Sequence, residues 1–290
     1  MTLWNGTKTF LLLAVLTGLL VFLGNALAGP TGLVLGLLIA GTMNFVSYWF
    51  SHRILLRMNG AREVGPADEP DLHNTLHRLA MRAEMPVPRL YLIPEDAPNA
   101  FATGRNPENA AVAVTAGLVK LLSKPEVEGV IAHELAHIRN RDTLIMTVAA
   151  GLGGALGMIA NMAAWGVMLG QGRGSDDESS GSSAITGLFG LLVAPVAAAV
   201  VQMAISRSRE YDADASGAQI TGNPLALAAA LQKIESWSRQ KPLTVNSAAA
   251  HMFIINPLTG RGISRLFSTH PSTAERVLRL ESMAGLKRVA

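Results

Sequence analysis

The feature that most constrains this chain is an uncharged apolar run near its beginning. Residues 9–51 contain no Asp, Glu, Lys or Arg, and Gly29-Pro30 breaks the run near its middle. Each half has about the length of a helix that crosses a bilayer, which needs roughly 20 apolar residues. The run therefore predicts two transmembrane helices, at about residues 9–28 and 32–51, joined by a tight turn.

A secretory signal peptide is the alternative for the first helix. Lys8 precedes the apolar stretch, and Ala26-Leu-Ala28 resembles a cleavage site. The apolar stretch is long for the central region of a signal peptide, which favours the membrane helix. In the second helix, Gly32 and Gly36 form a small-residue face suited to close packing against another helix.

Two further uncharged runs lie in the second half of the chain, at residues 143–170 and 184–206, and a polar segment separates them. They predict a second membrane hairpin over residues 143–206. Residues 52–142 and 207–290 are mixed in polarity. We expect them to be the two halves of one soluble domain, interrupted by the hairpin.

The distribution of positive charge predicts the orientation in the membrane. Arginines follow the second apolar helix closely and flank the second hairpin, whereas the segment between the two helices of that hairpin carries mainly acidic residues. Lys and Arg accumulate on the cytoplasmic side of membrane proteins. We therefore expect a multi-pass protein of the cell inner membrane with its N-terminus, its C-terminus and its active site in the cytoplasm.

The overall composition agrees with a chain that lies partly in lipid. Hydrophobic residues make up 49% of the 290 residues and charged residues only 16%. The net charge of +3 is small, and the basic residues collect beside the apolar runs, so nucleic acid is not expected as a partner. Cysteine is absent, so any metal must be held by His and carboxylate.

The strongest chemical signal is His133-Glu-Leu-Ala-His137, an H-E-x-x-H pattern. On a helix, positions i and i+4 project from the same face, so both imidazoles can bind one Zn²⁺ ion while Glu134 activates the attacking water. A helix is expected because Ser123 and Glu126 form a capping-box pattern just before an apolar run. The pattern predicts His133 and His137 as zinc ligands and Glu134 as the general base.

The same pattern also occurs by chance on helices whose histidines only pack or cap. His73 and His77 have the same spacing on another expected helix, at residues 68–83, but lack the glutamate. We interpret that pair as surface histidines without a metal role.

A third zinc ligand is expected from a second helix. Glu210 and Asp214 are again four residues apart, in Arg209-Glu-Tyr-Asp-Ala-Asp214. A solvated acidic helix face is the alternative. The zinc interpretation is favoured because the acids directly follow the second predicted hairpin and the H-E-x-x-H motif directly precedes it. Both are therefore expected at the same membrane surface. Glu210 would then bind the metal, and Asp214 would orient a ligating histidine.

Two strands are expected before the motif, at residues 89–93 and 111–115, and residues 98–104 between them are mostly small. An exposed sheet edge in that segment would bind an extended substrate through main-chain hydrogen bonds. The candidate substrate-binding residues are Asn99, Ala100, Phe101 and Ala102. A plain loop or an inner strand is the alternative.

Helices are also expected at residues 224–239 and 269–280. In the second of these, His270 and Arg276 are candidate donors to the transition state. A lone His before a Pro is more often a turn or cap residue, so a structural role for His270 is the alternative.

Together these features resemble the HtpX family of bacterial membrane zinc endopeptidases. The resemblance covers almost the whole chain. It rests on the two N-terminal spans, the second hairpin and four motifs: Asn99-Ala-Phe-Ala-Thr-Gly104, His133-Glu-Leu-Ala-His137 with Asp142, Arg209-Glu-Tyr-Asp-Ala-Asp214 and His270-Pro271. The family is similar to the CAAX prenyl endopeptidases and shares the two-histidine, one-glutamate zinc site of thermolysin-like enzymes. It implies an α-helical membrane protein with a cytoplasmic α+β zincin-like domain of the gluzincin type.

The resemblance also implies the activity and the roles of particular residues. It implies a zinc metalloendopeptidase with one Zn²⁺ per chain, with Glu134 as base and Asp214 as the support of a ligand. The implied zinc ligands are His133, His137 and Glu210. His270 and Arg276 match a C-terminal region linked to substrate or oxyanion contacts, although this chain has His-Pro-Ser where relatives often have His-Pro-Pro.

The partners implied by the resemblance are membrane lipid and unfolded or damaged membrane proteins. The family removes such proteins in quality control, often under stress, alongside the membrane-anchored ATP-dependent protease. Two other functions fit parts of the pattern. An intramembrane protease is disfavoured, because Glu126, Glu128 and Arg139 beside the motif would be costly at membrane depth. A zinc-stabilised scaffold or chaperone that binds unfolded segments without cutting them would need the ligands but not Glu134.

Overall fold

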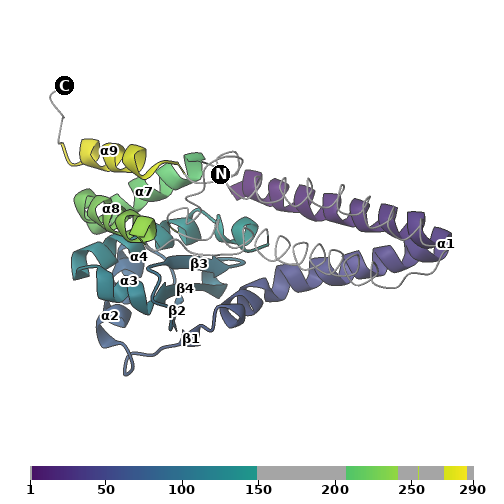
Figure 1. The fold of residues 1–290 in the computed structure, drawn as a ribbon, viewed down its shortest axis with the longest axis horizontal. Helices are drawn as coiled ribbons and strands as arrows, with labels where there is room; N and C mark the ends of the chain where they lie inside the picture. Colours follow the sequence, from purple (N-terminus) through teal and green to yellow (C-terminus); the bar gives the residue numbers. More distant parts are fainter. Residues whose placement is uncertain (1, 149–206, 241–253, 255–270, 286–290) are drawn as a thin grey trace.

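A helical hairpin projects from a domain in which helices pack against a four-stranded sheet (Figure 1). The computed structural model describes residues 2–148, 207–240, 254 and 271–285. Residues 149–206, which hold most of the predicted second membrane hairpin, lie outside the described residues.

The projecting hairpin is α1 (Thr2–Met58), a helical segment broken by a kink at Ala28 and Gly29. Gly29 has a φ of 57°, in the left-handed region that glycine adopts readily. The break therefore lies where the sequence predicts it. The second arm, Ala28–Met58, has 31 residues and is long and apolar enough to cross a membrane.

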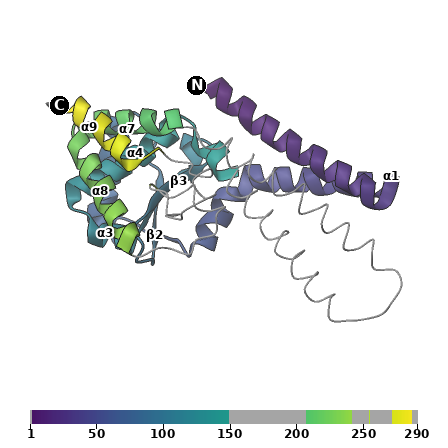
Figure 2. The ribbon, with the colours of Figure 1, turned by 45° about the horizontal axis from the view of Figure 1, so that its top comes forward.

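Small residues hold the two arms of α1 close together near the kinked end (Figure 2). Gly32 approaches Gly24 so closely that a side chain on either residue would collide with the other backbone. A Cβ added at Gly36 would lie 2.5 Å from the carbonyl oxygen of Leu20. The predicted small-residue face on the second helix is thus confirmed, and it packs against the first helix.

The sheet contains β1 (Arg62–Glu63), β2 (Arg89–Ile93), β3 (Ala100–Gly104) and β4 (Ala110–Thr115), in the order β1-β2-β4-β3. β2 and β4 are parallel, whereas β1 pairs with β2 and β3 pairs with β4 in antiparallel fashion. The two predicted strands are confirmed as β2 and β4. The segment between them forms β3, which lies at one edge of the sheet.

Alternating side chains give the sheet two apolar faces. Val112 and Val114 of β4 belong to the main core, together with Val130 of the long central helix. Ala111 and Ala113 point the other way and pack with Leu56 near the end of α1. The second arm of α1 therefore continues directly into the core of the domain.

The helices around the sheet come from both halves of the chain. The first half supplies α2 (Pro70–Arg82), the 3₁₀ turn η1 (Pro107–Asn109), α3 (Ala116–Leu121) and α4 (Lys124–Arg139). The second half supplies α7 (Arg207–Thr221), α8 (Pro224–Gln240) and α9 (Thr273–Met283). The predicted helices at α2 and α8 agree to within about two residues, and α4 begins at the predicted cap, Ser123. α9 starts later than predicted, because Ser272 is its N-cap and accepts a hydrogen bond from the N–H of Glu275 at 3.2 Å.

Candidate metal centre

The central helix α4 carries both histidines, and local contacts fix where it begins. The N–H of Ser123 donates a hydrogen bond to Oε2 of Glu126 at 2.8 Å, as the capping-box pattern predicts. Lys233 of α8 pairs with the same oxygen at 2.8 Å. From Val127 to Ile138 nearly every residue of α4 is buried, so the motif lies inside the domain.

The other end of α4 folds an acid back onto the second histidine. Arg141 has a φ of 58°, and its N–H donates to the carbonyl oxygen of Ile138 at 3.0 Å. The N–H of Asp142 donates to the carbonyl oxygen of His137 at 2.9 Å, which completes a Schellman turn. The turn brings Oδ2 of Asp142 to 3.3 Å from Nδ1 of His137. Sequence reasoning gave Asp142 no role of its own, and its only signal was its place five residues after His137.

The helix α7 packs directly against α4 at a glycine. A Cβ added at Gly217 would lie 2.9 Å from the backbone nitrogen of His133. This close approach places Asp214, one turn earlier, and Glu210, two turns earlier, beside the two histidines. Both carboxylates are buried, as is Arg209, whose charge acts on Glu210. The alternative of a solvated acidic face is therefore wrong, because α4 covers these acids.

Three side chains converge on one point at the contact between α4 and α7. Nε2 of His133 and Nε2 of His137 are 3.2 Å apart. The carboxylate oxygens of Glu210 lie 3.7 Å from the first of these nitrogens and 3.6 Å from the second. Among the described residues, only this group of acids and histidines lies close enough together to hold a metal ion. His73 is half-buried and His77 exposed on α2, as expected for surface histidines.

This donor set fits Zn²⁺. Zinc bound tetrahedrally at about 2.0–2.1 Å places its ligand atoms about 3.3 Å from one another, close to the separations observed. The electrostatic surroundings also favour a cation. Burial alone lowers the pKa of His137, but its hydrogen bond with Asp142 and the charges of Glu210 and Glu134 raise it to about 9. A divalent ion would take the place of that proton.

Asp214 supports the first histidine and is itself held by an arginine. Its Oδ1 lies 3.0 Å from Nδ1 of His133, although the two groups are not well aligned for a hydrogen bond. Arg276 of α9 donates to both oxygens of Asp214, at 2.6 and 2.8 Å, and also to the carbonyl oxygen of Ile254 at 2.8 Å. Burial alone would raise the pKa of Asp214, but Arg276 holds it below its usual value.

The candidate base lies between the two histidines and next to the sheet edge. Oε2 of Glu134 accepts a hydrogen bond from the N–H of Ala102 in β3 at 2.8 Å. Burial raises the pKa of Glu134, while the nearby histidines act in the opposite direction. The structure thus brings the predicted base, the predicted ligands and the predicted substrate segment together.

One expectation for the substrate segment is wrong. β3 is an edge strand, but all five of its residues are buried, so the edge is not exposed to solvent. Asn99 is also buried, and its side-chain oxygen accepts a hydrogen bond from the N–H of Ile254 at 3.2 Å. The sequence did not predict this contact with Asn99, because Ile254 lies far along the chain. His270 lies outside the described residues.

Comparison with known proteins places this geometry in a family. Residues 66–284 match the family described as Peptidase family M48. A protein named "Protease HtpX homolog" from Desulforapulum autotrophicum is 51% identical over 95% of this chain and 89% of its own length. The homologue of the same name from Pelotomaculum thermopropionicum is 51% identical over 97% of this chain and 99% of its own length.

A solved structure shows the same fold. The structure titled "Crystal Structure of S. mikatae Ste24p" aligns with a TM-score of 0.52 at 18% sequence identity. The alignment covers 96% of this chain but 66% of that chain, so this chain spans slightly less than two thirds of the other protein.

Proposed function

This chain belongs to peptidase family M48, among homologues named protease HtpX, and from that premise we propose that it cleaves misfolded or damaged proteins at the cytoplasmic face of the inner membrane. Members of this family are zinc metalloendopeptidases. The substrates and the location at the cytoplasmic face of the inner membrane are our proposal. One observation carries it: Glu134 lies between two buried metal-binding histidines and bonds to the edge strand β3. Base, metal ligands and a strand that can pair with a substrate backbone therefore meet at one point.

Glu134 performs the proton transfers of peptide hydrolysis in this proposal. Zinc bound by the three ligands would supply Lewis acidity, which polarises a carbonyl group and lowers the pKa of water. Glu134 takes the proton from the attacking water and gives it to the departing amine. Its burial assists, because a carboxyl group with a raised pKa is better matched to proton transfer near neutral pH.

We propose that the backbone of β3 supplies the substrate contact, and that a bound substrate replaces the contacts that bury this edge in the chain alone. The carbonyl of Asn99, just before β3, accepts a hydrogen bond from the N–H of Thr115 in β4, whereas the N–H of Ala102 points to Glu134. In an antiparallel pair, alternate residues face the partner strand. Ala100, Ala102 and Gly104 therefore direct their backbone groups away from β4. A substrate that pairs with these groups must be extended, which favours unfolded segments.

Arg276 is better suited to positioning than to oxyanion binding. Its guanidinium already donates to Asp214 and Ile254 and is 1% exposed. We assign it the role of holding Asp214 against His133. His270 stays our candidate for the donor that stabilises the oxyanion, as predicted from the sequence.

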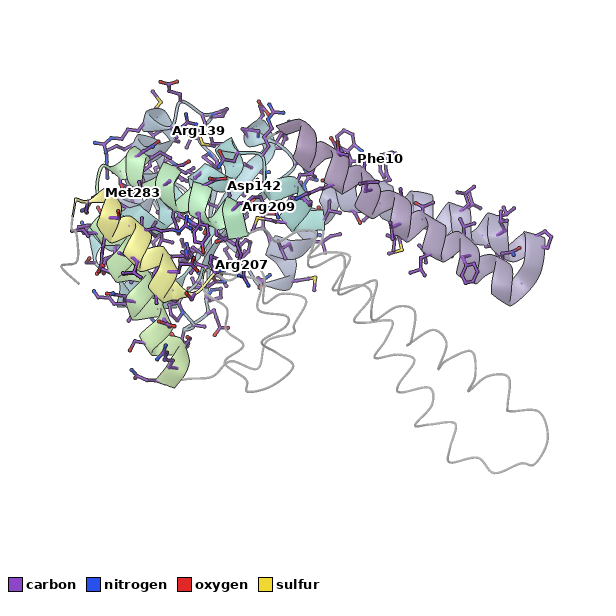
Figure 3. The ribbon with its side chains drawn as sticks, turned by 90° about the horizontal axis from the view of Figure 1, so that it is seen from above. Phe10, Arg139, Asp142, Arg207, Arg209 and Met283 are labelled. Atoms are coloured by element: carbon purple, nitrogen blue, oxygen red, sulfur yellow. The ribbon has the colours of Figure 1, made fainter. Side chains whose placement is uncertain are left out.

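The place of the site in the domain supports action at the membrane surface. Asp142, at the end of α4, and Arg209, near the start of α7, lie at the end of the domain from which α1 projects, whereas Met283 lies at the far end (Figure 3). Substrates that protrude from the bilayer would meet the site there. We expect its function to overlap with that of the membrane-anchored ATP-dependent protease.

Glu134→Gln in the purified, zinc-loaded full chain tests this proposal. We expect cleavage of an unfolded membrane-protein substrate to fall about 10²- to 10⁴-fold while the zinc content stays unchanged. Glu128→Gln, on the same helix but at the surface beside Arg78, is the matched control and should cleave normally. If Glu134→Gln cleaves at the wild-type rate, the enzyme does not use this base; if a folded substrate is cut as fast as the unfolded one, the substrate class is wrong.

Topology needs a separate experiment. Sealed inverted membrane vesicles expose the cytoplasmic face, so an added protease should digest the zinc domain in them. Protection of the domain would overturn the cytoplasmic placement and leave the enzyme class unaffected.

A further inference from the structure

The charges of three arginines act on His52, near the end of the second arm of α1. Arg53 lies near the end of α1, Arg89 begins β2 and Arg105 directly follows β3. The strand register pairs both Arg89 and Thr103 with Ala111 of β4, so the start of β2 and the end of β3 lie at the same end of the sheet. We name Arg53, Arg89 and Arg105 the arginine cluster.

The charges of this cluster converge on one buried side chain. His52, which is only 5% exposed, experiences the charge of all three arginines. None of the three forms an ion pair with a carboxylate within the described part of the chain. Glu63 is nearby, but it accepts a hydrogen bond from the hydroxyl of Tyr91 at 2.9 Å. The cluster therefore keeps an excess of positive charge.

Exposed aromatic side chains place this charge at the depth of lipid headgroups. Tyr48, Trp49 and Phe50 are 38%, 42% and 40% exposed on the arm that is long enough to span a membrane. Tyr and Trp collect at the interface between the bilayer core and water. Cζ of Arg105 lies 4.2 Å from the centroid of the Trp49 ring, so the cluster and the aromatic residues share one level.

A fixed turn holds Arg105 in this position. Gly104 has a φ of 133°, and a Cβ at this residue would lie 2.7 Å from Cα of Ala110. Only glycine fits there, and the turn directs Arg105 towards Trp49. Arg105 directly follows β3, the strand whose Ala102 N–H donates a hydrogen bond to Glu134 of α4.

We propose that the arginine cluster binds the phosphate headgroup of an anionic phospholipid from the leaflet that faces the zinc domain. Guanidinium groups bind phosphate through paired, charge-assisted hydrogen bonds, and three of them whose charges act on the same residue, His52, suit a phosphodiester that carries a single charge. The exposed aromatic side chains beside the cluster would contact the upper part of the acyl chains. The site is separate from the metal centre and does not depend on proteolysis.

Lipid binding to the delipidated full chain in a neutral detergent tests this inference. Phosphatidylglycerol and phosphatidylcholine with identical acyl chains are titrated, and bound lipid is counted by native mass spectrometry. We expect wild type to prefer phosphatidylglycerol. Each basic residue near a charged headgroup contributes about fivefold in affinity, so the double variant Arg89→Gln/Arg105→Gln should lose roughly 25-fold.

The matched control removes the same charge elsewhere. Arg78→Gln/Arg239→Gln changes one arginine on α2 and one on α8, each of which pairs with an acid, and this variant should bind phosphatidylglycerol like wild type. If the glutamine variant fails to fold, Arg89→Lys/Arg105→Lys serves as the second test. It keeps the charge and should retain most of the binding. Equal binding of the two lipids by wild type, or an equal loss in the control, would overturn the proposal. Competition by inorganic phosphate as strong as that of phosphatidylglycerol would show a free-phosphate site instead.

Discussion

The helices α4 and α7 together hold the three candidate ligands, but they are stabilised in different ways. α4 has a capping box at its start, a Schellman turn at its end and mainly apolar buried residues between them. α7 instead buries Arg209, Glu210 and Asp214. Burying charged groups costs several kcal/mol unless they are paired, so α7 depends on partners supplied by α4 and α9. The part of the site on α4 is thus determined mainly by neighbouring residues, whereas the part on α7 depends on residues distant in sequence.

The largest effect is expected from removal of Glu210, the candidate ligand on α7. Glu210→Ala should release most of the zinc from the purified protein, because it opens the coordination sphere, whereas Glu134→Ala should keep the metal and lose turnover. Asp214→Ala should be intermediate, since a residue that orients a ligand typically contributes about 10- to 100-fold in affinity or activity. Metal analysis and a cleavage assay on the same samples measure both effects.

The control for Glu210 is another acid on the same helix. Asp212→Ala removes a half-buried carboxylate outside the ligand group and should keep zinc at the wild-type level. Loss of zinc from Glu134→Ala together with its retention in Glu210→Ala would reverse the two assignments.

The buried ion pair between α7 and α9 should dominate the stability of this half of the site. Arg276→Met leaves Asp214 buried without its partner, and we expect the free energy of unfolding in detergent to fall by about 3–5 kcal/mol. The double variant Arg276→Met/Asp214→Asn should lose less than the sum of the two single changes, because it leaves no unpaired charge.

Arg279→Met provides the matched control on α9. Arg279 is more than half exposed and stacks on the ring of Tyr211, so its loss should cost no more than about 1 kcal/mol. Equal losses for the two arginines would show that the pairing of Asp214 does not stabilise α7.

The sequence predicted the locally encoded features and missed those that depend on distant contacts. The spacing of His133 and His137, the cap at Ser123 and the helical span of α4 follow from neighbouring residues. The position of Asp142 depends on a left-handed Arg141, a conformation for which the sequence offers no glycine signal. Sequence reasoning therefore identified His137 as a ligand but not Asp142 as the acid that supports it.

Long-range packing explains the other differences. Arg276 lies 62 residues beyond Asp214, and no periodicity links the two, so pairing could be seen only in the folded chain. The burial of β3 likewise depends on contacts with α4 and on Ile254, which an alternating strand pattern does not encode. The edge position of β3 agrees with one of the interpretations that the sequence left open, beside a plain loop and an inner strand.

The smallest effect concerns the contact that joins α7 to α4. Gly217→Ala places a methyl group against the backbone of His133, which should reduce the free energy of unfolding by about 1–3 kcal/mol and weaken zinc binding as Glu210 moves away. Alanine is intrinsically favoured over glycine within a helix by about 1 kcal/mol, so a net loss would identify the steric contact. Gln219→Ala, at an exposed position on the same helix, should change stability by no more than about 0.5 kcal/mol. If Gly217→Ala gains stability and binds zinc normally, the close approach at Gly217 is not what positions the ligand on α7.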